Sequence, residues 1–118
     1  MAQVGQTADD RDHRVGAARS DIIDLFQQLD ITPILLSDTD SKLGGVETFA
    51  EAQKCAALFR KHADEIDGIL VVLPNFGDEK GVADTIKLSG LQVPVLVQAS
   101  PDDLHLMDVV NRRDAWCG

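Results

Sequence analysis

The segment DGILVVLPNFGDE (67–79) constrains the fold of this chain most, because it joins a strand, a loop and a helix start. Ile69–Leu73 is apolar throughout, rich in β-branched side chains and too short for a helix, which predicts a strand covered on both faces in a parallel sheet. Pro74 ends this strand because it cannot donate to the ladder. The glycine that follows permits a turn, and Asp78 or Glu79 then places a carboxylate at the start of a helix.

The residues after this strand form the candidate functional site, because open α/β sheets bind ligands beyond the carboxyl ends of their parallel strands. They are Asn75, Phe76 and Asp78. A structural alternative stays open for each of them. Phe76 could plug the end of the sheet, and Asn75 could hydrogen-bond its own turn. Asp78, with Glu79, could serve first as a helix start, a contribution of ~0.3–1 kcal/mol.

The rest of the chain alternates between helical and extended patterns. Helices are expected over 15–29, from Glu47 or Thr48 through Phe59, over 79–89 and over 101–110, and strands over 31–36, 69–73 and 93–97. This order predicts βα units with right-handed crossovers, and therefore an α/β protein with a three-layer αβα, flavodoxin-like (Rossmann-like) parallel sheet. Residues 1–14 are polar and patternless and predict a mobile tail, which leaves a single domain over 15–118.

Both ends of the chain depart from a complete flavodoxin-like pattern. Such a sheet needs a strand before the first helix, and the one candidate, Met1–Gly5, is poor, so the first strand is expected to be degraded or missing. The chain finishes with Trp116–Gly118 directly after a charged segment, and we interpret both ends as cut. A sheet that lacks a strand keeps open edges, which predicts self-association.

Composition excludes several classes of partner. The net charge of −9 argues against nucleic acid and anionic membranes, because phosphate groups require a basic face. The chain has no apolar run of signal-peptide or membrane-spanning length, so a cytoplasmic location is expected. The three histidines, His13, His62 and His105, are scattered without metal-ligand spacing, and His62 suits the end of its helix.

Other reactive side chains have structural interpretations. Cys55 lies on the apolar face of its helix and is expected in the core, whereas the role of Cys117 stays undetermined. Asp38 and Asp40 belong to a loop of Ser and Thr, which indicates a solvated loop. We interpret Arg112-Arg113-Asp114 as a surface link to a following domain rather than as an anion site.

Seven short segments, in order and with natural spacing, carry a family resemblance: GVET (45–48), AQKCA (52–56), LPNFGDE (73–79), PVLVQA (94–99), Pro101, RRD (112–114) and CG (117–118). They resemble the N-terminal domain of the L-fucose/L-arabinose isomerase family, in particular its fucose isomerase-like branch. The resemblance covers about Val15 to Gly118. Each segment is weak alone, and together they are fairly specific.

The resemblance implies a cytoplasmic, manganese-dependent aldose–ketose isomerase that moves a proton between adjacent sugar carbons through an ene-diol. Its metal-binding Glu, Asp and His lie in later domains, so no residue here inherits a metal-ligand role, and Mn2+ is implied only for the complete enzyme. Such enzymes are typically homo-oligomers in which the N-terminal domain closes over the active site of a neighbouring subunit. Phe76 occupies the place from which related enzymes present an aromatic residue to the neighbour's monosaccharide. Arg11 or Arg14 could match an arginine that some members supply.

Two hypotheses from different classes follow. The first is a substrate-gating and oligomerisation domain of a fucose/arabinose-type sugar isomerase, inactive when isolated. The second is a stand-alone flavodoxin-like regulatory or sugar-sensing module without catalysis. A receiver-type phospho-switch is a third option, but the acids expected at the end of its first strand are not recognisable.

Overall fold

Two parallel strands form the sheet of this computed structural model, which describes residues 8–108 and 112–115. Strand β1 (Ile69–Leu73) pairs with β2 (Val95–Ala99), and Ile69 lies opposite Val95. The strand expected at 69–73 is confirmed. The strand expected at 93–97 begins two residues later, because Pro94 has no N–H and joins the ladder only through its carbonyl, which accepts from Ile69 N at 2.9 Å.

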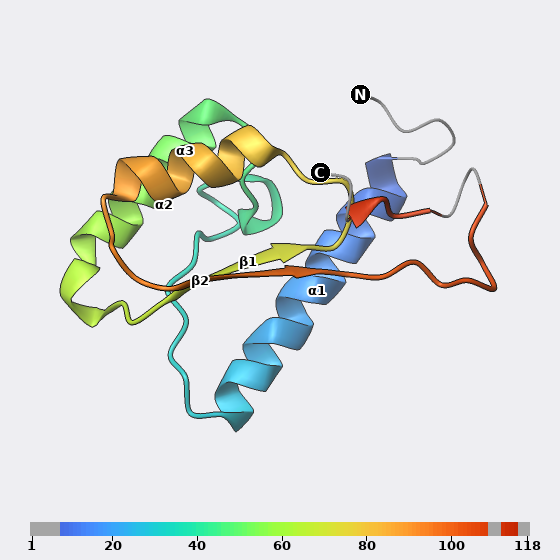
Figure 1. Cartoon of the computed structure of the whole chain (residues 1–118), viewed down its shortest axis with the longest axis horizontal. Helices are drawn as coiled ribbons and strands as arrows, with labels where there is room; N and C mark the ends of the chain where they lie inside the picture. The colour runs from blue at the N-terminus through green and yellow to red at the C-terminus, as the bar shows by residue number, and fades with distance from the viewer. Residues whose placement is uncertain (1–7, 109–111, 116–118) are drawn as a thin grey trace.

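Helices α2 (Phe49–Lys61) and α3 (Glu79–Ser89) pack against each other (Figure 1). Both begin at the expected caps. The Thr48 hydroxyl accepts from Glu51 N at 3.2 Å while the Glu51 carboxylate accepts from Thr48 N at 3.0 Å, which makes a capping box. Asp78 caps α3, and Gly90 ends it with a left-handed φ of 66°, as expected from a glycine at this position.

Helix α1 (Ala8–Gln28) begins earlier than the sequence pattern indicates and lies apart from the α2–α3 pair (Figure 1). The predicted tail is therefore wrong over residues 8–14, which are helical. This segment contains no Pro or Gly, and its early acids suit the positive end of the helix dipole. A contact with a distant residue also holds it, since Asp12 pairs with Lys42 at 2.7 Å. The first-strand candidate, Met1–Gly5, lies outside the described residues.

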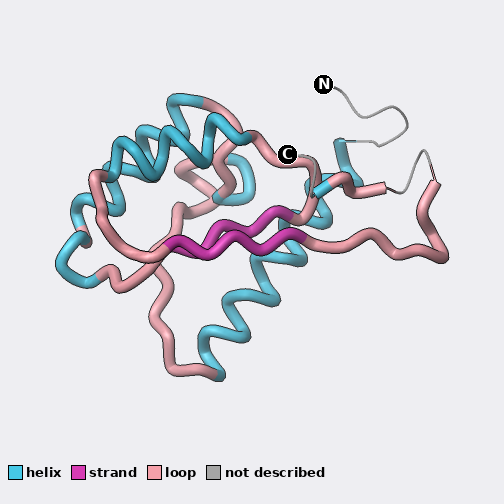
Figure 2. Tube along the Cα trace, viewed as in Figure 1, coloured by secondary structure: helices cyan, strands magenta, loops and turns pink. Residues whose placement is uncertain are grey.

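The segment 31–36 is irregular, so the strand predicted there is wrong. Its backbone groups find other partners: Ile31 N donates to Phe26 O at 2.8 Å, and the Arg19 guanidinium donates to Leu36 O at 2.7 Å. Pro33 also removes one of the donors that a ladder would need. The apolar run thus crosses the molecule as a loop (Figure 2).

The helix predicted over 101–110 is also wrong within its described part, residues 101–108. The Asp103 carboxylate accepts from His105 N at 2.9 Å, and the Asp103 carbonyl accepts from Leu106 N at 3.0 Å, so the chain closes a single turn. Leu104 and Leu106 are 80% and 63% exposed. A helix here would have no packed apolar face to stabilise it, and short helices depend on such packing.

The core is small. The buried apolar residues of the described part of the chain are Leu36, Ala52, Cys55, Ala56, Ile69, Ala99 and Ala115. Strand β1 is buried at Ile69 and half-buried over the rest of its length, so it is only partly covered, contrary to the prediction. Strand β2 is exposed over 95–98. The molecule is therefore an α/β arrangement of helices around a small parallel sheet. None of its described helices has the length and apolarity needed to cross a membrane.

Candidate functional site

The candidate site lies where β1 and β2 end. Ser100 N donates to Leu73 O at 3.0 Å, so the two strands finish side by side. The loop after β1 and the loop after β2 therefore leave the same edge of the sheet. Such an edge is where open α/β sheets bind ligands.

Asn75 is buried at this edge, with 6% of its surface exposed. Its side-chain oxygen accepts from Arg14 Nη1 at 3.2 Å, and its side-chain nitrogen donates to Arg11 O at 3.1 Å. Both hydrogen bonds go to α1 rather than to the turn that contains Asn75. The amide therefore ties the loop after β1 to a helix that lies more than sixty positions earlier in the chain.

Phe76 follows directly and is 42% exposed, so it is not a core residue of the kind that plugs the end of a sheet. The next residue, Gly77, lies close to the side chain of Leu73: a Cβ there would be 2.8 Å from Leu73 Cδ2, so a larger residue would require that side chain to shift. Phe76 is exposed on a loop whose neighbouring residue, Asn75, is fixed by its hydrogen bonds to α1.

Asp78 lies at the start of α3 and is exposed. Its carboxylate accepts from Lys80 N at 3.1 Å. This contact satisfies one of the N–H groups that a helix leaves open at its first turn. The structural role expected for Asp78 is thus present. The residue lies three positions after Asn75 and two after Phe76 on the same loop.

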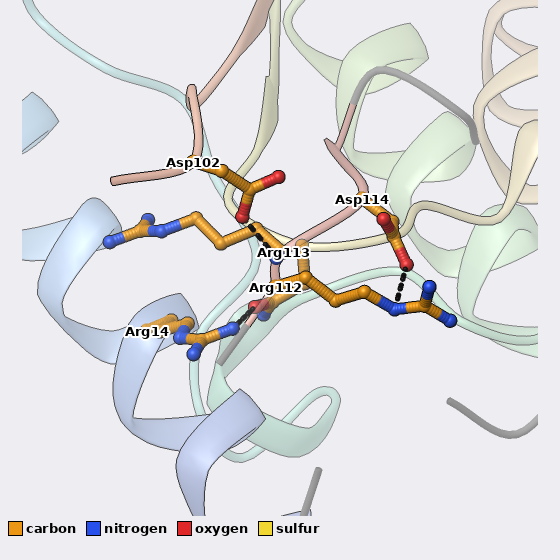
Figure 3. Close-up of polar contacts among 6 residues, drawn as sticks. Arg14, Asp102, Arg112, Arg113 and Asp114 are labelled. Carbon is orange, nitrogen blue, oxygen red and sulfur yellow. Dashed lines mark hydrogen bonds and ion pairs between the residues drawn. The ribbon is translucent and has the colours of Figure 1, made fainter. Parts of the chain in front are cut away.

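Two arginines also contact the loop 74–78, and we call this loop and the two arginines the corner of the sheet. Local sequence patterns do not connect these residues. Arg14 contacts Asn75, as described above, and Arg113 Nη1 lies 3.5 Å from Pro74 O. The Asp102 carboxylate, from the loop after β2, accepts from the backbone N of Arg113. In Figure 3 the side chain of Arg113 extends toward α1, whereas Arg112 extends the other way, with its Nε 3.0 Å from Asp114.

The sequence contained a partial signal for this corner. Arg14 and the run Arg112-Arg113-Asp114 are recognisable in the sequence as two separate features. The contacts that unite them with the loop after β1 span 61 positions for Arg14 and 39 for Arg113. No spacing rule links residues at such separations.

Several other titratable side chains that the sequence analysis named have local contacts. His62 ends α2 and lies 2.7 Å from Glu65, while His13 and His105 are exposed. Asp40 accepts from the Ser37 hydroxyl at 2.7 Å, and this hydrogen bond lowers the pKa of its carboxyl. Within the described part of the chain, no three His, Cys, Asp or Glu side chains are grouped so that they could hold a metal ion.

Cys55 is buried on α2, as expected, and burial raises the pKa of its thiol to about 11. A thiol in such surroundings is a packing group, because the reactive thiolate is disfavoured. Cys117 lies outside the described residues.

Comparison with known protein families assigns the chain to one of them. The model for the N-terminal domain of fucose/sulfoquinovose isomerases matches residues 11–118. This chain belongs to that family. The match includes Arg14, the loop 74–78 and the segment that contains Arg113, so the whole corner described above lies inside the fucose/sulfoquinovose isomerase N-terminal domain. No curated protein and no solved structure matches the chain.

Proposed function

We propose that this domain covers the sugar in the active site of a metal-dependent aldose–ketose isomerase and helps to hold the subunits of the enzyme together. The observation that carries the proposal is the family match over residues 11–118. The exposed Phe76 at the carboxyl edge of the sheet supports it, because an aromatic ring on a fixed loop can pack against the apolar face of a sugar.

The three candidate residues have different parts in this proposal. Phe76 packs against the monosaccharide, and the exposed carboxylate of Asp78 accepts from a sugar hydroxyl at the rim of the site. Asn75 acts indirectly, because its side chain is buried and is committed to α1. Asn75 therefore fixes the position from which Phe76 reaches the sugar.

The chemistry itself is assigned to other parts of the enzyme. Mn2+ and the groups that move the proton between adjacent sugar carbons belong, in this proposal, to catalytic domains of a neighbouring subunit in a cytoplasmic homo-oligomer. The present domain contributes binding and exclusion of water, and it has no isomerase activity alone. In the assembled enzyme its two parallel strands form part of a larger flavodoxin-like sheet.

An aldose–ketose conversion assay with Mn2+ tests this proposal. The assay is run on the 118-residue chain alone and on the product of the entire reading frame that encodes it. We expect conversion only in the second case. Conversion by the short chain would contradict the proposal, because it would require a catalytic centre within this domain. Sugar binding without conversion in either form would instead favour a regulatory or sugar-sensing module.

Substitution of Phe76 separates binding from folding in the same assay. For Phe76→Ala we expect a higher KM for the sugar and a loss of stability below ~1.5 kcal/mol, because the ring is only half-buried. Phe49→Ala is the matched control, since Phe49 is 56% exposed at the start of α2. A large loss of stability with an unchanged KM would place Phe76 in the core and outside the sugar site.

A further inference from the structure

The C-terminal end of α1 projects away from the sheet and from the α2–α3 pair (Figure 1). None of the residues 10–28 is buried, so this long helix has no core position of its own. Leu25 and Leu29 are neighbours on one helix face and are 44% and 58% exposed, and Ile31, just beyond the helix, is 46% exposed. Three large apolar side chains thus gather at one exposed end, and we call residues 25–31 the α1 tip.

The α1 tip has a closed, hydrogen-bonded backbone rather than a frayed helix end. Ile31 N donates to Phe26 O at 2.8 Å, and Asp30 N donates to Gln27 O at 3.3 Å. Asp30 has a left-handed φ of 57°, so these contacts form a Schellman motif with Asp30 at the position where glycine is usual. The segment that follows is tied back to α1 through Leu36 O. The exposed apolar side chains are therefore presented on a defined backbone.

The surroundings of the α1 tip are acidic. Asp21, Asp24 and Asp30 are exposed, and the sequence over 20–41 contains no Lys, Arg or His. Within the residues that the structure describes, none of these three carboxylates forms an ion pair. The last turn of α1 contains no basic residue either. Because the C-terminus of a helix carries a partial negative charge of its own, the acids add to this charge instead of neutralising it.

These features define the kind of surface that fits the α1 tip. Exposed apolar side chains on one face of a helix fit an apolar groove. The unpaired carboxylates and the helix C-terminus fit positive charge at the border of that groove. A second copy of this domain fits less well, because its net charge of −9 repels an equally acidic tip. Charge complementarity therefore favours a basic partner surface.

We propose that the α1 tip binds an apolar groove bordered by Lys and Arg side chains on a catalytic domain of a neighbouring subunit. This inference rests on the proposed function, because it names the surface through which the domain contacts its partner in the assembled enzyme. Near the other end of α1, Arg14 contacts Asn75 at the candidate site. The helical rise places Gln28 ~21 Å from Arg14 along the axis. One helix thus contacts the sugar-site loop near its start and a neighbouring subunit at its end.

Photo-crosslinking of the product of the entire reading frame tests which surface covers the tip. p-Benzoylphenylalanine replaces Gln28, which is exposed next to Leu29. We expect a product of twice the subunit mass, in which the crosslinked peptide lies outside residues 1–118. The same replacement at Gln53, which is exposed on α2, is the control and should give no such product. A crosslink within one subunit, a crosslink to residues 1–118 of a second copy, or no crosslink would each overturn the inference.

A charge variant tests the basic border of the groove by sedimentation velocity of the same protein. Asp24→Lys should weaken the association between subunits by ~10-fold, because it places a positive charge against a positive border. Its effect on folding has the opposite sign, since a cation suits the C-terminal end of a helix. Asp64→Lys is the matched control, because Asp64 is exposed in the turn after α2 and the change in charge is the same. If Asp24→Lys strengthens association, or if both variants weaken it equally, the inference is wrong.

An apolar variant tests the groove itself in the same measurement. Leu29→Ser should also weaken the association by ~10-fold, because a leucine that becomes buried at the interface is replaced by a polar side chain. Leu104→Ser is the matched control, because Leu104 is 80% exposed on the loop after β2 and should not change the association. Both leucines are exposed in this domain, so neither change should affect its folding. Unchanged association in Leu29→Ser would mean that the tip stays in water.

The outcomes distinguish this inference from the proposed function. Sugar conversion by the complete enzyme, together with unchanged association in Asp24→Lys and Leu29→Ser, would overturn the inference and leave the proposed function intact. Absence of conversion would contradict the proposed function. In that case the crosslink from position 28 would still show whether a neighbouring subunit covers the α1 tip.

Discussion

Asn75 connects the loop after β1 to α1 through the two hydrogen bonds of one buried amide. For Asn75→Ala we expect a loss of about 1–3 kcal/mol in the free energy of unfolding, because the substitution leaves the Arg14 guanidinium and Arg11 O without this partner. Urea unfolding followed by circular dichroism measures the change. Gln53→Ala is the control, because Gln53 is exposed on α2. An equal effect of the two substitutions would mean that the amide does not fix the loop.

Cys55 offers a second prediction at the residue scale. Its thiol pKa of about 11, compared with 9.0 for an exposed thiol, reduces the thiolate fraction at pH 8. Two pKa units correspond to ~100-fold less thiolate, so modification of the native thiol should be slower by about that factor than in urea. The rate is measured with a chromogenic thiol reagent in a Cys117→Ser background, where Cys55 is the one remaining cysteine. Equal rates in the native and unfolded chains would show that the thiol is accessible.

The role of a residue could be predicted from the sequence where its contacts are local. It could not be predicted where its partners lie far away along the chain. The core position of Cys55 follows from helical periodicity, and the cap at Asp78 follows from the residues beside it. The partners of Asn75 lie 61 and 64 positions away, so its commitment to α1 had no signal in the sequence around it. The meeting of Arg14 and Arg113 at one loop is hidden for the same reason.

At the scale of an element, the capping box of α2 gives a direct test. Thr48→Ala removes the hydroxyl that accepts from Glu51 N and should cost ~1 kcal/mol of stability. Thr39→Ala is the matched control, because the Thr39 hydroxyl contacts Ser37 on an exposed loop, and its effect should stay below ~0.5 kcal/mol. Thermal unfolding of both variants measures the difference. A Thr48→Ala variant as stable as the control would indicate that α2 is held by packing alone.

Elements were predicted correctly where the signals for their start, their period and their end agree. α2, β1 and α3 have such signals: a cap, an apolar run ended by Pro74, and a cap followed by Gly90. The segment 31–36 has an apolar run and no strand beside it in the described part of the chain, so it remains a loop. Pairing depends on tertiary neighbours, which a local apolar run does not specify.

At the scale of the whole molecule, the sheet has an open side. In the part of the chain that the structure describes, β2 pairs with β1 on one edge and with no strand on the other. Val95, Leu96 and Val97 are 40%, 67% and 55% exposed along this strand. An apolar strand with unpaired backbone groups is a template for pairing with another chain. The exposed apolar edge of β2 thus favours association between chains, whereas the net charge of −9 opposes it.

We therefore expect self-association that grows with protein concentration and with ionic strength, because salt screens the repulsion between acidic chains. Sedimentation velocity across a concentration series at low and high salt measures it. Leu96→Lys should reduce the association by placing a charge on β2, as natural edge strands do. Leu104→Lys is the matched control: Leu104 is 80% exposed but lies outside the strand, so the same added charge should have a smaller effect. If both lysine variants reduce association equally, net charge rather than the strand controls it. A single monomeric species under all conditions would mean that β2 does not serve as a contact surface in this chain.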